Sequence, residues 1–504
     1  MKFFKNLFSR FVFNALLVIG QAAVVALLIF RLSKYFFYIY VAANIFAYLI
    51  VLLLVNKKQS ANLKLPWIIF ILLFPIPGSI SYVIFGRQYF PKKRSERYKM
   101  VESKTQPFLS VDENIELPED VNSEFNYLKT VTNNVPTKYN DLKYYKSGED
   151  LYADLLESIK KAEKYIFIEF FILSKGKMLN EMMGLLELKV QEGLDVRVIY
   201  DDIGSMKKLS VNFNRKMEKR GIKCLKFRPF IPIMSGVHNN RDHRKIIVID
   251  GKICYTGGIN LADEYINEIH PFGHWKDNGI KVEGSAVDYY LGLFLTTWNT
   301  NYRVKDLDYK DFFTPQKVSK ENIMFTFGDG PAPIYNEHIT NNVYLNIINN
   351  SKKYLYITTP YLIIDYDLTN ALKIASKRGV DVRIITPHIP DKKAVFWITR
   401  NSYAELIKAG VKIYEYTPGF IHSKCILCDD YLSILGTVNF DYRSLIHHFE
   451  CASIMYNVSI YQEMYDDFME TLEKSEEISL EKAKKLNRYN RLFVYLIELF
   501  APLL

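Results

Sequence analysis

The sequence is poor in cysteine, with five among 504 residues: Cys224, Cys254, Cys425, Cys428 and Cys451. So few cysteines make no disulfide framework for a chain of this length, and a reducing compartment fits them. Cys425 and Cys428 have the spacing of half a zinc site, but no second pair exists and both lie in an apolar run. We therefore interpret these two as small buried residues on a strand.

Charge is absent from two long stretches near the N-terminus, 11–30 and 35–55. Each is long enough to cross about 30 Å of hydrocarbon as a helix, which needs about 20 residues. A cleaved signal peptide is the alternative for the first stretch, but its apolar part is too long and a second stretch follows almost at once. The sequence predicts a membrane anchor over residues 1–100 with two transmembrane helices.

A third apolar segment, 66–86, is interrupted by Pro75, Pro77 and Gly78. Such residues break or kink a helix, so the segment either spans with a kink or enters and leaves on one side. The re-entrant arrangement leaves more of the flanking Lys and Arg inside, as the positive-inside rule favours. Both arrangements predict a multi-pass protein of the bacterial cell membrane with residues 87–504 in the cytoplasm.

Positive charge exceeds negative charge, with 65 Lys and Arg against 55 Asp and Glu and a formal net charge of +10. This balance favours an anionic partner, either nucleic acid or an acidic membrane surface. The length indicates two or three folded units. A polar stretch at 101–135 is predicted to be a linker between the anchor and these units.

Beyond the linker, helix-like and strand-like runs alternate, as in an α/β domain. Three runs of the first part resemble three runs of the second: 160–173 and 351–364, 192–202 and 378–388, 219–227 and 408–416. Internal similarity is stronger evidence for architecture than local propensity. We therefore predict a duplication, with a first half at 136–310 and a second at 311–480.

One short motif occurs in both halves at a constant offset of 179 residues. The first copy and the second copy contain, in order, His243, Lys245, Asp250, Gly257 and Asn260, and His422, Lys424, Asp429, Gly436 and Asn439. A single copy is a weak signal. Two copies with the same trailing Gly and Asn, inside a larger repeat, are not expected by chance.

The strand period assigns different roles to the motif residues. Residues i and i+2 of a strand face the same way, so His243 points with Lys245 and His422 with Lys424. Asp250 and Asp429 lie five residues past the lysines and point away, so we expect them to fix the strand ends by hydrogen bonds. Asn260 and Asn439 follow a Gly-containing turn and can return to the site as neutral donors. The remaining histidines have no such frame, although His447 and His448 could border the site.

This set of side chains suits a phosphodiester. Lysines and amides hold non-bridging oxygens and stabilise the charge of the transition state. One imidazole can attack phosphorus while the other protonates the leaving oxygen, because histidine titrates near neutral pH. The motifs need no cluster of acidic ligands, so no metal and no cofactor are implied.

The two HxKxxxxD motifs resemble those of the phospholipase D superfamily. The chain is similar over nearly its whole length to bacterial cardiolipin synthases, through YDDIGS at 200–205, HRKIIVIDG, TPYLIID at 359–365, GFIHSK and the closing LFAPLL. The resemblance implies two pseudo-symmetric α/β/α halves with one shared active-site cleft, preceded by transmembrane helices. It also implies that both motifs are catalytic, Asp250 and Asp429 included.

By the same resemblance, the protein transfers a phosphatidyl group from one phosphatidylglycerol to another at an anionic membrane and releases glycerol. His243 is the expected nucleophile and His422 the acid–base. The superfamily places an acid beside each histidine, and here Asp277 matches for His243 and Glu450 for His422. A phospholipase D or a phosphatidylserine synthase of the same superfamily is the alternative. A nuclease is disfavoured, because the anchors hold the site away from nucleic acid; the oligomeric state stays open.

The C-terminal segment 481–504 has apolar residues at helical spacing, after a start crowded with Lys and Arg. Such a basic amphipathic helix can lie on an anionic membrane. It can equally pack onto the catalytic domain, and the sequence favours neither.

Overall fold

A computed structural model describes residues 19–21, 23, 36–57, 61–86, 90–112, 115–231, 236–302, 309–314, 318–486 and 491–501. The chain forms two compact units. The first contains residues Met1–Tyr89, Pro229–Asn240 and Tyr495–Leu504, and the second contains Phe90–Arg228 and Arg241–Val494. All five cysteines are free and buried.

The first unit contains α3 (Phe36–Asn56), which confirms a helix in the predicted range 35–55. Its segment Phe37–Asn56 is the one described helix that is long and apolar enough to cross a membrane. The predicted helix at 11–30 lies outside the described residues except for 19–21 and 23.

Two shorter helices follow, α4 (Ala61–Leu73) and α5 (Pro75–Phe85), and the break between them is where Pro75 was predicted to cause one. With 13 and 11 residues, they are about 20 and 17 Å long at 1.5 Å per residue, each short of a span of about 30 Å. The helices pack closely, since a Cβ on Gly78 would lie 2.7 Å from the Ile71 Cα. The Trp67 and Tyr82 rings meet edge to face.

The second unit is built on one sheet of 15 strands, whose order is β19-β13-β12-β10-β15-β16-β18-β9-β1-β8-β6-β5-β2-β3-β4. Their bounds are β1 Thr137–Tyr145, β2 Tyr165–Phe170, β3 Asp195–Asp201, β4 Lys223–Phe227, β5 Ile246–Ile249, β6 Ile253–Gly257, β8 Gly279–Gly284, β9 Glu321–Asp329, β10 Tyr354–Thr358, β12 Asp381–Pro387, β13 Lys412–Tyr416, β15 Cys425–Cys428, β16 Leu432–Gly436, β18 Glu450–Tyr456 and β19 Ser475–Glu477. Each of the six repeated runs contains one strand of this sheet: β2, β3 and β4 in the first part, and β10, β12 and β13 in the second. Both sets of three are parallel.

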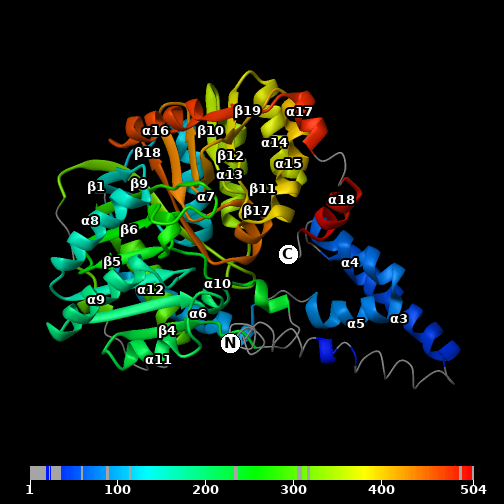
Figure 1. Cartoon of the computed structure of the whole chain (residues 1–504), viewed down its shortest axis with the longest axis horizontal. Helices are drawn as coiled ribbons and strands as arrows, with labels where there is room; N and C mark the ends of the chain where they lie inside the picture. Colours follow the sequence, from blue (N-terminus) through cyan, green and yellow to red (C-terminus); the bar gives the residue numbers. More distant parts are fainter. Residues whose placement is uncertain are drawn as a thin grey trace. The chain divides into compact units, whose positions relative to one another are not determined.

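Helices cover both faces of this sheet (Figure 1). The alternation along β2 explains why: Phe167 packs into one core cluster, while Ile166 and Ile168 pack into another on the opposite face. One face is covered by α7 Glu119–Thr132, α8 Gly148–Lys160, α9 Lys177–Gln191, α11 Phe213–Glu218, α13 Ile339–Asn350, α14 Tyr366–Lys377 and α15 Lys393–Lys408. The other face is covered by α6 Lys92–Thr105, α12 Val287–Asn301 and α16 Tyr461–Glu473.

The prediction of a linker at 101–135 is wrong. Most of this stretch belongs to α6 and α7, which pack against the sheet. In α7, Val121, Phe125 and Leu128 are fully buried at a spacing of three to four residues. The polar residues between them cover the outer face of an amphipathic helix.

The C-terminal segment contains two described helices, α17 (Leu480–Leu486) and α18 (Arg491–Phe500), and residues 487–490 lie outside the described ranges. Helix α17 packs against α15, and its Ala483 belongs to a core cluster of the second unit. The start of the segment is therefore part of the second unit. Residues from Tyr495 onward belong to the first unit.

Candidate active site

The two histidine segments are placed by strand pairing between distant parts of the chain. The backbone N–H of His243 donates to the carbonyl of Phe449 (2.9 Å), and the N–H of Phe449 donates to the carbonyl of Arg241 (2.8 Å). In the same way, β14 (Gly419–Ile421) pairs in parallel with β7 (His274–Lys276), and the N–H of His422 donates to the Lys276 carbonyl (2.7 Å). Each histidine therefore lies beside the segment that leads to the acid of the other half.

The acids are consequently exchanged relative to the expected pairs. His243 Nδ1 lies 2.8 Å from Glu450 Oε1, and His422 Nδ1 lies 2.7 Å from Asp277 Oδ2. The prediction that Asp277 orients His243 and Glu450 orients His422 is wrong, because the segment before each acid pairs with the histidine segment of the other motif. The predicted chemistry of each pair is kept: a buried carboxylate fixes Nδ1 and leaves Nε2 for the reaction.

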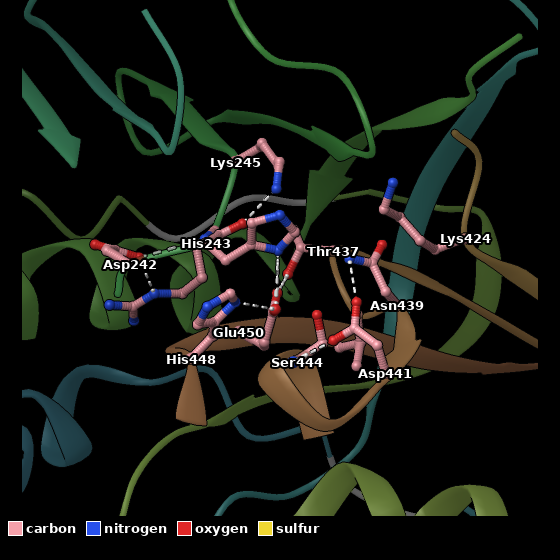
Figure 2. A network of polar contacts seen from close by, with 12 residues as sticks. Asp242, His243, Lys245, Lys424, Thr437, Asn439, Asp441, Ser444, His448 and Glu450 are labelled. Atoms are coloured by element: carbon pink, nitrogen blue, oxygen red, sulfur yellow. Dashed lines mark hydrogen bonds and ion pairs between the residues drawn. The ribbon is translucent and has the colours of Figure 1, made fainter. Parts of the chain in front are cut away.

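The motif lysines lie on the same side as their histidines, as the strand period predicted. Lys245 Nζ donates to the carbonyl of His243, and Lys424 Nζ donates to the carbonyl of His422. In Figure 2, Lys245 is drawn next to His243 and Lys424 next to Asn439. Lys424 Nζ is also 2.9 Å from His422 Nδ1. Because that nitrogen donates its proton to Asp277, we read this last contact as proximity rather than as a hydrogen bond.

Burial, together with repulsion between neighbouring cations, lowers the pKa values of the two motif histidines and the two motif lysines. Burial, and then the charges of Lys245 and Lys424, put the pKa of His243 well below its usual value. Burial and Lys424 lower the pKa of His422 to about 4. Burial likewise lowers the pKa of Lys245 to about 8 and that of Lys424 to about 7. A bound anion would reverse these shifts, so the site is built for negative charge.

The acid beside His422 is held ionised. Burial alone would raise the pKa of Asp277, but the attraction of His422 and Lys424 and hydrogen bonds from His422 and the Asn278 N–H outweigh it. Its pKa therefore stays below the usual value. An ionised carboxylate at this place stabilises the imidazolium form of His422 when a proton arrives.

One group among the described residues has a geometry that could hold a metal ion: His243, His448 and Glu450, whose ligand atoms lie within 4.8 Å of one another. Zinc accepts such a set of nitrogen and oxygen ligands. However, the charges of Lys245 and Lys424, which after burial are the main cause of the lowered pKa of His243, would also repel a dication. The group therefore fits an anionic ligand better than a metal.

Asp250 and Asp429 do what the strand period predicted. The carboxylate of Asp250 accepts backbone N–H groups from Glu163, Lys164 and Tyr165 at 2.7–2.9 Å, at the start of β2. The carboxylate of Asp429 accepts the same three bonds at the start of β10, from Lys352, Lys353 and Tyr354. These aspartates join the hairpin after each motif to the neighbouring strand.

The two asparagines each keep a donor. Asn260 Oδ1 accepts from the N–H of Ile172 (3.0 Å), and its Nδ2 donates to the hydroxyl of Tyr265 (2.6 Å). Asn439 Nδ2 donates to Asp441 Oδ2 (3.3 Å). Each amide nitrogen has two N–H groups and makes one of these contacts, so one N–H remains for a phosphate oxygen.

Sequence reasoning missed the partner of the second acid. Thr437 donates its hydroxyl proton to Glu450 Oε2, whereas the position 179 residues earlier is Gly258. Glycine is required there, because a Cβ would lie 2.1 Å from Asp277 Oδ1. The sequence shows the difference at this offset, but the residues shared by the two motifs do not reveal it.

His448 borders the site, as the sequence suggested, but its place beside His243 and Glu450 was not predicted. Its ring centre lies 5.3 Å from that of His243, and its Nδ1 lies 3.6 Å from Glu450 Oε1. Neither ring nitrogen has a hydrogen-bond partner among the described residues. Burial lowers its pKa to about 3, so it is a neutral ring against Glu450.

Comparisons with known proteins identify the family of the chain. The family described as cardiolipin synthase, phospholipase D-like domain, matches residues 155–272 and 344–472, and a phospholipase D-nuclease N-terminal family matches residues 42–87. A cardiolipin synthase of Alkalihalophilus pseudofirmus is 31% identical, covering 89% of this chain and 90% of that protein. A cardiolipin synthase of Staphylococcus aureus is 31% identical, covering 94% and 97%.

The fold has a counterpart among solved structures. A phosphatidylserine synthase of Haemophilus influenzae superposes with a TM-score of 0.58 at 14% identity, over 76% of this chain and 97% of that one. At this identity the likeness concerns the fold alone. The sequence identity of 31% to two relatives over nearly their whole length is stronger evidence. It shows that the chain belongs to the cardiolipin synthases with phospholipase D-like domains.

Proposed function

We propose that the protein is a phosphatidyltransferase that converts two phosphatidylglycerols into cardiolipin and glycerol. One observation carries the proposal: two buried histidines, each fixed at Nδ1 by a carboxylate, share one site with two buried lysines. Such a site binds a phosphodiester and supplies both a nucleophile and an acid–base without a metal. The family to which the chain belongs identifies the substrate as a lipid.

In the first step, His243 Nε2 attacks phosphorus of the donor lipid. The P–N bond forms, the bond from phosphorus to the glycerol oxygen breaks, and His422 gives its proton to that oxygen. Lys245, Lys424 and the free N–H groups of the asparagines stabilise the charge on the non-bridging oxygens. Glycerol leaves, and His422 is now neutral.

In the second step, His422 takes the proton from a headgroup hydroxyl of the acceptor lipid. The oxygen attacks phosphorus, the P–N bond breaks, and cardiolipin is released with His243 restored. The pKa of His422 of about 4 belongs to the empty site. Since burial and the lysine charges cause that shift, a bound phosphodiester anion raises the pKa and lets His422 hold its proton.

The assignment of the two histidines is tested by trapping. His422→Ala should accumulate a phosphatidyl-histidine if glycerol departs slowly unaided, whereas His243→Ala should not. Acid-quenched protein incubated with labelled phosphatidylglycerol would reveal the adduct by mass. Label held covalently by the His243→Ala variant would make His422 the nucleophile.

The overall reaction is tested with purified full-length protein in bilayers of labelled phosphatidylglycerol, without nucleotide or metal. We expect cardiolipin and free glycerol as the main products, and regeneration of phosphatidylglycerol from cardiolipin by excess glycerol. Mainly phosphatidic acid would favour a phospholipase D. A requirement for a cytidine diphosphate lipid would favour a phosphatidylserine synthase.

The anchor is proposed to keep this site at the membrane. We propose two spans, 11–30 and 35–55, and a re-entrant hairpin at 66–86, with the catalytic domain in the cytoplasm. The shortness of α4 and α5 supports the hairpin. Reporter fusions after residues 60 and 95 should then both report cytoplasm, and opposite signals would mean a third span.

The catalytic domain is proposed to consist of two pseudo-symmetric halves, 136–310 and 311–480. The constant offset of the motifs and the two parallel sets β2-β3-β4 and β10-β12-β13 at opposite ends of one sheet support this division. Phosphatidylglycerol is proposed as both donor and acceptor, within an anionic membrane, and no nucleic acid is a substrate. Incubation with labelled single-stranded DNA should leave the DNA intact.

A further inference from the structure

Two buried arginines beside the histidine segment belong to neither motif. Arg228 directly follows β4, and Arg241 lies two residues before His243. The exposed fraction of Arg228 is 9% and that of Arg241 is 4%. They are in contact, because Arg241 Nη1 donates to the carbonyl of Arg228 (3.1 Å).

The side chain of Arg241 lies on the reactive side of its segment. Residues 241–243 are extended, since the N–H of His243 and the carbonyl of Arg241 both bond to Phe449. On one side, Arg244 Nε donates to Asp242 Oδ1 (3.1 Å). Side chains alternate along an extended chain, so Arg241 shares the opposite side with His243 and Lys245.

The distance between Arg241 and His243 along the segment suits a second phosphate. Two residues of extended chain advance about 6.6 Å, so Arg241 begins about that far from His243 along the segment. In cardiolipin, one glycerol separates the two phosphorus atoms, which is a comparable length. This linker is flexible, so an acceptor phosphate can lie beside the histidine segment while the acceptor hydroxyl meets phosphorus from the side opposite His243.

The pair has more positive charge than its surroundings neutralise. Among the described residues, Asp201 is the one carboxylate that forms an ion pair with Arg241, at 3.4 Å. Asp201 already accepts the N–H groups of Ile203, Gly204 and Asp242. Burial lowers the pKa of Arg228 to about 9, and repulsion by Arg241 and Arg94 adds to that shift.

Both guanidinium groups also have unused donors. Arg228 Nη1 and Arg241 Nε are buried and have no hydrogen-bond partner in the described part of the chain. Buried donors without acceptors are costly, and an arginine pair matches the oxygens of a phosphate. The ring of Phe90, whose centre lies 4.8 Å from the Arg228 guanidinium carbon, holds that group in place.

The second half has no counterpart of this pair. In the aligned runs, Thr417 follows β13 where Arg228 follows β4, and Phe420 lies two residues before His422. The Phe420 ring packs on Trp275 with centres 4.8 Å apart. A second anion is therefore favoured beside the first histidine only.

We propose that Arg228 and Arg241 form a binding site for the phosphate of the acceptor lipid. This inference rests on the proposed function, because only a transfer between two phospholipids brings a second phosphodiester to the site. The pair binds the acceptor phosphate and so positions its hydroxyl for attack, which favours the lipid over water at the phosphorus.

The test compares two reactions that share the donor lipid. Exchange of labelled glycerol into phosphatidylglycerol needs the first phosphate alone, whereas cardiolipin formation needs both. In Arg228→Gln and Arg241→Gln, the ratio of cardiolipin formed to glycerol exchanged should fall at least about tenfold, from the loss of charge-assisted hydrogen bonds. Arg241→Lys should lose less. Arg220→Gln, which removes an exposed arginine paired with Glu187, should keep the wild-type ratio.

The outcomes separate this inference from the proposed function. An unchanged ratio, or an equal fall of both reactions in variants with wild-type melting temperatures, would overturn the acceptor site. Wild-type protein that makes phosphatidic acid instead of cardiolipin would refute the proposed function itself. If millimolar inorganic phosphate stabilises the wild type but not the glutamine variants, and the ratio is unchanged, the pair binds free phosphate and not the lipid.

Discussion

The substitution Asp250→Asn tests whether this aspartate has a structural or a catalytic role. The carboxylate accepts three N–H groups: Oδ1 from Lys164 and Tyr165, and Oδ2 from Glu163. Asparagine can keep the two bonds to Oδ1, but its NH₂ then faces the Glu163 N–H. The backbone conformation at this position does not oppose the substitution, because the φ of 56° at Asp250 is in a region that asparagine tolerates.

The expected cost follows from these contacts. One charge-assisted bond to a buried acceptor is lost, worth about 1.5–3 kcal/mol, and the other two lose their charge. We therefore expect a loss of about 3 kcal/mol in the free energy of unfolding. For a cooperative unit of about 400 residues, this lowers Tm by roughly 3–4 °C. Asp429→Asn should behave alike, because its three bonds have the same pattern.

The measurement is thermal unfolding in detergent, combined with the activity of the folded protein at low temperature. We expect a lower Tm and an activity per folded molecule within a few-fold of wild type. Asp430→Asn is the control, since its ion pair with Lys353 is well exposed on both sides and contributes little. A variant with the wild-type Tm and an activity reduced a hundredfold would place Asp250 in the chemistry.

Three further predictions follow from the site. In the His422→Ala background, Glu450→Gln should slow formation of the His243 adduct by about 10²–10⁴, whereas Asp277→Asn should not. A slower adduct in Asp277→Asn alone would show that Asp277 orients His243. Since the lysine pKa values are about 7 for Lys424 and about 8 for Lys245, kcat/KM should fall as pH rises through 7 to 8; a flat profile to pH 9.5 would contradict this. Chelators should not lower the rate, because the lysine charges beside His243, His448 and Glu450 disfavour a dication at this group; loss of activity on chelation would reveal a required metal.

The sequence predicted those features that depend on local spacing. The alternation along a strand placed Lys245 with His243 and turned Asp250 away, and the structure has both arrangements. The helical spacing of Val121, Phe125 and Leu128 was equally readable, but the polar composition of 101–135 led to the prediction of a linker.

The pairing of acids and histidines was beyond local reasoning. Asp277 follows His243 along the chain and Glu450 follows His422, so chain order suggests pairs within each half. The observed pairs depend on which backbone segments lie together, His243 with Phe449 and His422 with Lys276. Those contacts join residues that are distant in sequence, and no periodicity of one segment specifies them.

The exchange of acids means that neither copy of the motif is complete by itself. A polypeptide with one copy would have needed a second molecule to orient its histidine, so a single-motif ancestor would have worked as a pair of identical chains. If the two halves arose by duplication, as proposed above, fusion into one chain would have allowed the two copies to differ. Thr437 and Gly258 occupy the same place in the two copies and make different contacts. Two separately expressed fragments, each inert, should regain turnover on mixing.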